Sequence, residues 1–137
     1  MRPPAKARPG DAGPVREIGP ITQTDIVRFA GAGGDFNPLH HDPGFARAAG
    51  FGTVIAMGQL QAGLLAAWLT DWLGIENLRE YEVRFAAPVA LGDVLQLTGE
   101  VVAVDTQDGV PVAEVAQRVE RDGDLVVKAR AKVRLAQ

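Results

Sequence analysis

The chain has 137 residues, 47% of them hydrophobic and 23% charged, which is the composition of one ordinary soluble globular domain. Its formal net charge at pH 7 is -3, so it lacks the basic excess that nucleic-acid binding normally requires. Cysteine is absent, which excludes disulfides, thiolate nucleophiles and cysteine metal sites and is compatible with a reducing cytoplasm.

The beginning of the chain is predicted to be a flexible tail. Residues 1–14 are rich in proline, alanine, glycine and basic side chains, and they lack the apolar core of a secretory signal. One domain is expected over residues 15–137. The longest apolar stretch, residues 55–73, contains glutamine, threonine and aspartate, so it favours a buried helix over a membrane span. We therefore expect a cytoplasmic protein with no membrane partner.

Two helices are predicted before the apolar stretch. Thr22 followed by Asp25 is typical of a helix N-cap with an acidic residue in the first turn, and this helix should end at the glycines of residues 31–34. The Asp-Pro pair at residues 42–43 favours a second, short helix that ends near Gly50. The segment between the two helices is therefore expected to be a loop.

A long buried helix and a sheet are predicted for the rest of the chain. From about Gly58, apolar residues recur at helical spacing over most of the helix circumference, so other structure must surround this helix. After Gly74 the apolar period changes from 3.6 to 2, which predicts strands. The Asp-Gly pairs at residues 108–109 and 122–123 predict tight hairpins. Strands are expected around residues 80–85, 95–101, 112–120 and 125–135, with an edge strand within residues 16–21.

These elements predict an α+β protein in which a curled antiparallel sheet wraps one long central helix. This arrangement is the single hotdog fold.

Chemistry is concentrated in the loop of residues 34–40. Adding water to an activated double bond requires a base for the water, an acid for the carbon that is protonated, and donors for the negative charge that develops. Asp35 and His40 can divide the acid and base roles, and Asn37 can help to hold the water. The N–H of Gly58, at the start of the long helix, suits this negative charge, because unpaired N–H groups and the helix dipole favour negative charge there.

The order Gly-Asp-x-Asn-Pro-x-His, followed by a glycine before the buried helix, resembles the MaoC-like (R)-specific enoyl-thioester hydratases and 3-hydroxyacyl-thioester dehydratases. The resemblance covers about residues 18–137. It implies that Asp35 and His40 are the catalytic pair, that Asn37 lies beside them, and that Gly58 is the oxyanion-hole residue. It further implies a hydro-lyase of fatty acid metabolism that needs no metal and no cofactor other than the coenzyme A or acyl carrier protein of its substrate.

The resemblance also implies a dimer, because single hotdog units pair so that the substrate runs between two subunits. The partner is expected to be a second copy or a related hotdog subunit. One departure concerns Met57, where family members commonly carry histidine, and it bears on rate and substrate preference. Acyl length, the choice between coenzyme A and carrier protein, and the pathway are not determined by the sequence.

Two other functions remain open. A hotdog acyl-thioesterase would hydrolyse the thioester, but the Asp-x-Asn-Pro-x-His loop belongs to the hydratase pattern. A non-catalytic subunit of a heteromeric dehydratase would usually lack the aspartate or the histidine, and this chain keeps both Asp35 and His40.

Two residue patterns outside the loop each have two interpretations. Basic side chains occupy every second position of residues 128–134, which indicates either a solvent-facing row or a docking surface for coenzyme A phosphates or an acidic carrier protein. Trp68 and Trp72, four residues apart, are predicted to belong to the core and not to stack on a ligand.

Overall fold

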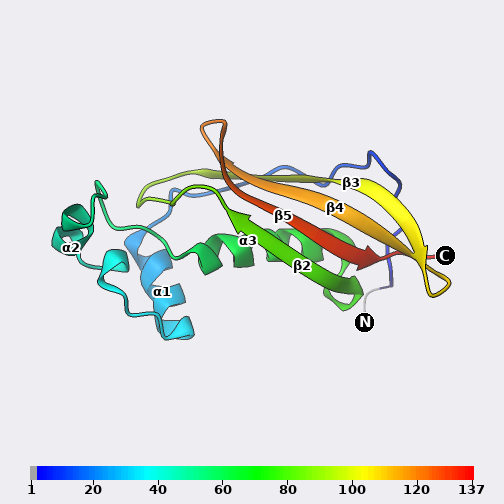
Figure 1. Ribbon diagram of the computed structural model, residues 1–137, viewed down its shortest axis with the longest axis horizontal. Helices are drawn as coiled ribbons and strands as arrows, with labels where there is room; N and C mark the ends of the chain where they lie inside the picture. Colours follow the sequence, from blue (N-terminus) through cyan, green and yellow to red (C-terminus); the bar gives the residue numbers. More distant parts are fainter. Residues whose placement is uncertain (1–2) are drawn as a thin grey trace.

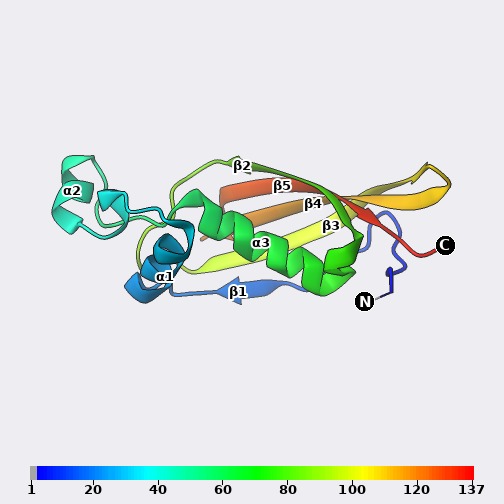
Figure 2. The ribbon, with the colours of Figure 1, turned by 90° about the horizontal axis from the view of Figure 1, so that it is seen from below.

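The computed structural model describes residues 3–137, in which one long helix lies across one face of a five-stranded antiparallel sheet. The helix is α3 (Gly58–Leu73), and the sheet curves over it (Figures 1 and 2). This arrangement confirms the predicted α+β hotdog fold. The strands are β1 (Arg16–Ile18), β2 (Leu78–Phe85), β3 (Leu95–Gln107), β4 (Val110–Arg121) and β5 (Asp124–Arg134).

The strands lie in the order β1-β3-β4-β5-β2, and every neighbouring pair is antiparallel. Both Asp-Gly hairpins are confirmed: Asp108, Gly109, Asp122 and Gly123 all have positive φ, as tight hairpin turns of this kind require. The predicted edge strand is confirmed but shorter than expected. It ends at Ile18 because the backbone turns away at the following glycine, whose φ is +135°, and the next residue is a proline without an N–H.

Both short helices form where capping residues predicted them. Helix α1 (Gln23–Gly33) has a reciprocal cap, in which Thr22 and Asp25 each accept a backbone hydrogen bond from the other. These hydrogen bonds, led by the one from the Thr22 backbone, lower the pKa of Asp25 from its ordinary value. Helix α1 continues through the first glycines of its predicted end and stops at Gly34, which adopts the left-handed conformation. Helix α2 (Pro43–Ala48) is capped by Asp42.

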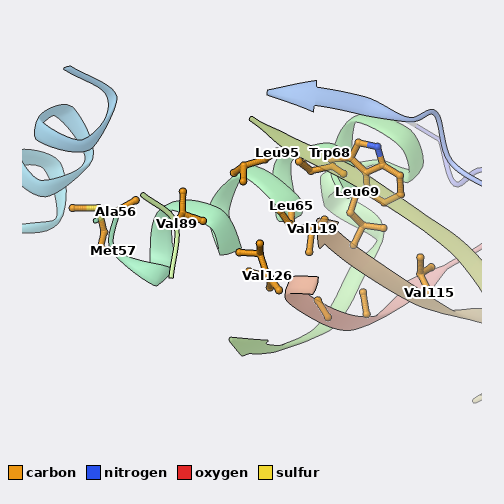
Figure 3. Packing of buried hydrophobic residues seen from close by; sticks show 14 of the residues in the cluster. Ala56, Met57, Leu65, Trp68, Leu69, Val89, Leu95, Val115, Val119 and Val126 are labelled. Atoms are coloured by element: carbon orange, nitrogen blue, oxygen red, sulfur yellow. The ribbon is translucent and has the colours of Figure 1, made fainter. Parts of the chain in front are cut away.

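The core lies between α3 and the sheet (Figure 3). Trp68 is fully buried and donates its indole N–H to the carbonyl oxygen of Pro14 at 2.6 Å. The ring of Trp72 packs against that of Trp68, with 5.5 Å between their centroids. Both tryptophans therefore contribute to packing, as predicted. No helix within residues 3–137 is long and apolar enough to cross a membrane.

The described part of the predicted tail lies against the sheet. Gly10 donates its N–H to Val101, Val101 donates to Asp11, and Gly13 donates to Gly99, so this segment follows the edge of β3. Residues 10–13 are thus hydrogen-bonded to the domain, whereas the sequence predicts a flexible tail. Composition could not reveal this contact, because the hydrogen-bond partners lie about 90 residues away along the chain. The predicted domain boundary after residue 14 stays a prediction.

In the basic row of β5, Lys128 and Arg130 are exposed and Lys132 and Arg134 are partly buried, and the row is partly paired with acidic side chains. Arg130 pairs with Glu114 of β4, and Lys132 pairs with Glu80 of β2. These contacts favour the solvent-facing interpretation of the row. A docking role stays a prediction.

Candidate active site

The Asp-x-Asn-Pro-x-His loop is shaped by its own side chains. After α1 ends at Gly34, the Asp35 carboxylate accepts a hydrogen bond from the Asn37 N–H at 3.3 Å. The side-chain oxygen of Asn37 accepts from the Leu39 N–H at 3.0 Å and caps the short 3-10 helix η1 (Pro38–His40). The motif thus folds locally into a turn that brings its aspartate and histidine together.

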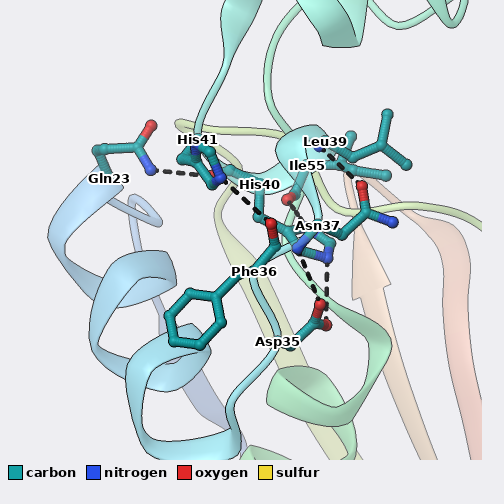
Figure 4. Close-up of polar contacts among 8 residues, drawn as sticks. All are labelled: Gln23, Asp35, Phe36, Asn37, Leu39, His40, His41 and Ile55. Atoms are coloured by element: carbon teal, nitrogen blue, oxygen red, sulfur yellow. Dashed lines mark hydrogen bonds and ion pairs between the residues drawn. The ribbon is translucent and has the colours of Figure 1, made fainter.

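Asp35 and His40 face one another (Figure 4). Nε2 of His40 lies 3.3 Å from Oδ2 of Asp35. The other ring nitrogen, Nδ1, lies 2.7 Å from the carbonyl oxygen of Ile55. Because a carbonyl oxygen can only accept, Nδ1 carries a hydrogen and donates it. Nε2 without a hydrogen and the Asp35 carboxylate are both acceptors. Their contact is therefore favourable when one additional proton lies between these two atoms.

The two members of the pair differ in exposure. The His40 side chain is 8% exposed, whereas that of Asp35 is 44% exposed. Gln23 of α1 donates a hydrogen bond to the His40 backbone carbonyl at 2.9 Å, which ties the histidine to the preceding helix. The pair thus consists of a fixed, buried imidazole and a carboxylate that solvent or a substrate can reach.

Ile55 connects this pair to the start of α3. Its carbonyl oxygen accepts from His40, its N–H donates to Leu39 at 3.1 Å, and α3 begins three residues later at Gly58. The helix has no side-chain cap, and the Gly58 N–H has no hydrogen-bond partner among residues 3–137. This first turn therefore has an unpaired donor at the positive end of a 16-residue helix.

Phe85 covers Gly58 and was not identified from the sequence. A Cβ atom added at Gly58 would lie 3.0 Å from the Phe85 ring, so the ring rests directly on this glycine. Phe85 ends β2 on the same side as Tyr81, whose hydroxyl donates to the Ala62 carbonyl of α3. The alternation that puts Tyr81 and Phe85 on one side of β2 was the sequence signal from which Phe85 could have been identified. The Phe85 ring is 48% exposed, so this part of α3 borders solvent.

The remaining candidate residues have structural contacts of their own. Asn37 is exposed and its oxygen is engaged in the cap, while its amide N–H groups have no partner among the described residues. Met57 is buried in the core, 5% exposed. His41 is exposed, and its Nε2 lies 3.4 Å from the Phe36 carbonyl oxygen. Within residues 3–137, no group of three histidine or acidic side chains is placed to hold a metal ion.

Comparison with known proteins identifies the family of the chain. Residues 6–122 match the family model described as MaoC like domain. The chain is 34% identical to the 3-hydroxybutyryl-CoA dehydratase of Methylorubrum extorquens over 119 residues, which are 82% of this chain and 75% of that protein. It is 34% identical to the (R)-specific enoyl-CoA hydratase of Aeromonas caviae over 115 residues, which are 81% of this chain and 84% of that protein.

The fold is also similar to a solved structure. A chain in the crystal structure of the ChsH1-ChsH2 complex from Mycobacterium tuberculosis superposes with a TM-score of 0.79 at 26% identity. The match covers 96% of this chain and all of that one, 100%. The family model and the two relatives each span most of the chain, and the relatives are named as a dehydratase and a hydratase. The chain therefore belongs to the MaoC-like domain family and is an enzyme of the hydro-lyase class.

Proposed function

We propose that this enzyme hydrates 2-enoyl thioesters with (R) stereochemistry and catalyses the reverse dehydration of (R)-3-hydroxyacyl thioesters. The observation that best supports this reaction is the Asp35–His40 pair, 3.3 Å apart and joined through Ile55 to the start of α3. The names of the relatives support the same reaction and its stereochemistry. The acyl group is carried by coenzyme A or an acyl carrier protein, which belongs to the substrate.

The proposed reaction uses the pair as both base and acid. In hydration, one member removes a proton from water as the water oxygen bonds to C3. The negative charge then spreads onto the thioester oxygen, where the N–H of Gly58 stabilises it. The other member delivers a proton to C2, and dehydration retraces these steps. Acid–base groups of this kind typically contribute about 10²–10⁴-fold in rate.

The pair can exchange protons in both directions because of its environment. His40 is held through Ile55 and through the Gln23 contact to its backbone, so the ring does not have to reorganise. Asp35 is accessible and can reach water directly. We further propose that Asn37 uses its unpaired amide to hold this water.

The test of the reaction class is incubation of the purified protein with crotonyl-CoA. Loss of enoyl absorbance without release of free thiol indicates hydration, and oxidation of the product by an (R)-specific but not an (S)-specific 3-hydroxyacyl dehydrogenase gives the stereochemistry. Release of free thiol would instead indicate the thioesterase alternative.

The same assay also tests the non-catalytic alternative. If the protein acted on neither acyl-CoA nor acyl-carrier-protein substrates across a range of acyl lengths, but activated a related hotdog subunit, the proposal would be wrong. The range of acyl lengths would at the same time define the substrate preference.

A further inference from the structure

Gln61 has a buried side-chain amide without a hydrogen bond. The residue lies on α3 and is 3% exposed, and its Oε1 atom is buried without a partner. No other residue within 3–137 donates to or accepts from this amide. Burying an unpaired amide destabilises a protein, so a buried amide normally has a partner. The missing partner of Gln61 therefore requires an explanation.

Among residues 3–137, the side-chain oxygens of Gln117 and Asn77 are also buried without a partner, but their amide nitrogens, unlike that of Gln61, make a hydrogen bond. Gln117 of β4 donates its Nε2 to the Leu65 carbonyl at 3.2 Å, and Asn77 donates its Nδ2 to the Leu73 carbonyl at 2.9 Å. Each of these amides therefore fastens α3 to its surroundings through one hydrogen bond. Gln61 makes no such contact, so fastening the helix does not account for it.

The polar group next to Gln61 is already satisfied. Tyr81 of β2 directs its hydroxyl to the carbonyl of Ala62, the residue after Gln61, at 2.8 Å. Burial of the Tyr81 hydroxyl raises its pKa to about 12, so the group keeps its proton and remains a donor. This donor is used by Ala62, and Oε1 of Gln61 has no partner among residues 3–137.

The position of Gln61 relates it to the first turn of α3. Residues three apart lie on the same helix face, and helix side chains lean toward the N-terminus. The Gln61 side chain is therefore expected to lean back over the turn that Gly58 begins. Gly58 has an unpaired N–H, and the half-exposed ring of Phe85 covers it. Helix geometry therefore places the unpaired amide of Gln61 one turn from the unpaired donor of Gly58, beside the half-exposed Phe85.

We propose that Gln61 binds the reacting oxygen of the substrate, an inference that rests on the proposed function. Its Oε1 can only accept, so its partner must be a donor, and the reacting O–H group is the donor that the proposed reaction supplies. The attacking water in hydration and the 3-hydroxyl group in dehydration both satisfy this requirement. The hydrogen bond to Gln61 orients this oxygen between C3 and the Asp35–His40 pair.

The test replaces Gln61 with methionine, which has a similar length and shape but no hydrogen-bonding amide. We expect the melting temperature of Gln61→Met to equal or exceed that of the wild type, because an unpaired buried amide is removed. At the same time kcat/KM should fall by about tenfold, as expected for the loss of one hydrogen bond to the reacting oxygen.

The loss of kcat/KM should appear in KM in one direction of the reaction and in kcat in the other. The equilibrium constant fixes the ratio of kcat/KM between the directions, so the loss of kcat/KM is the same in both. Only the hydroxyacyl substrate carries the O–H group. Gln61→Met should therefore raise KM for 3-hydroxybutyryl-CoA in dehydration, and lower kcat for crotonyl-CoA in hydration with its KM unchanged. A purely structural role would not produce this division.

Gln117→Met is the matched control, because it removes another buried amide whose oxygen also lacks a partner. It should lose the bond to Leu65 and keep kcat/KM within about twofold of the wild type. Gln61→Leu provides a second apolar replacement should Gln61→Met fail to fold.

Three results would overturn the inference: unchanged kcat/KM in a folded apolar Gln61 variant, an equal loss in Gln117→Met, or equal changes of KM for both substrates. An inactive wild-type protein would instead contradict the proposed function.

Discussion

His40 is held through a ring nitrogen and through its backbone carbonyl before any substrate binds. Nδ1 donates to Ile55, and the backbone carbonyl accepts from Gln23. Such preorganisation lets electrostatic and acid–base groups act without rearranging during the reaction. Asp35 is held less tightly and is more exposed, which suits a group that exchanges protons with water. At the level of single residues, the site therefore combines a fixed imidazole with an accessible carboxylate.

Gly58 is expected to tolerate no side chain. A methyl group there would lie 3.0 Å from the Phe85 ring and would displace either the ring or the first turn of α3. We expect Gly58→Ala to reduce kcat/KM, and Gly58→Val to reduce it by about 10²–10³-fold, the usual loss when an oxyanion donor is removed. Steady-state rates on one enoyl-CoA measure both variants.

Gly63→Ala is the control for this experiment. Gly63 lies on the same helix, and its added methyl would meet only one atom of Phe29, at 3.9 Å. It should keep wild-type kcat/KM and gain stability, since alanine exceeds glycine in helix propensity by about 1 kcal/mol. A folded Gly58→Val enzyme with unchanged kcat/KM would remove Gly58 from the mechanism.

Among the elements, those determined by local contacts could be predicted from the sequence. The cap formed by Thr22 and Asp25, the two Asp-Gly turns and the helix that begins at Gly58 depend on residues close in sequence. The sequence likewise predicted that Asp35 and His40 work as a pair; the structure brings their side chains together, and their catalytic role stays a prediction. The side of β2 that carries Phe85 could be predicted from the alternation of its residues, but its contact with Gly58 and the unpaired amide of Gln61 could not, because both depend on tertiary packing around α3.

The N-terminal segment offers a test at this scale. A Cβ atom at Gly13 would lie 2.5 Å from the Trp68 ring, so the segment is closely packed there. We expect Gly13→Ala to lower the free energy of unfolding by about 1–3 kcal/mol, as overpacking does. Gly31→Ala, where a methyl would meet nothing within 4 Å, should not lower it. Equal thermal melts for Gly13→Ala and the wild type would contradict the close packing of this segment against Trp68.

The cap of α1 should make the stability of the protein depend on pH in the acidic range. The pKa of Asp25 is lowered by the Thr22 hydrogen bonds, so its stabilising effect is complete above the unfolded pKa of about 3.9 and is lost as pH falls through the folded pKa. Asp25→Asn should therefore melt below the wild type at neutral pH, and the difference should shrink in acid. A difference that stayed constant across this range would contradict the assignment.

Considered as a whole, the molecule leaves β2 as an edge strand of eight residues. Such an edge is a template for pairing with another chain, and its last residue is the half-exposed Phe85 beside the site. We therefore expect a dimer to be the smallest active unit. Sedimentation of the purified protein across a concentration range, with activity measured in parallel, tests this.

The same experiment identifies the partner. An active species with the mass of two copies indicates a homodimer, whereas activity that appears only after a related hotdog subunit is added indicates a heterodimer. An active monomer at micromolar concentration would rule out both.

The most direct test of the proposed mechanism is the hydration rate of Asp35→Asn and His40→Ala, with His41→Ala as the matched control. His41 is an exposed neighbour with one weak backbone contact, so its variant should keep the wild-type rate. We expect each variant of the pair to lower kcat by at least about 10²-fold while circular dichroism shows an intact fold. Folded variants of Asp35 and His40 that hydrate crotonyl-CoA at near wild-type rates would contradict the assignment of this pair.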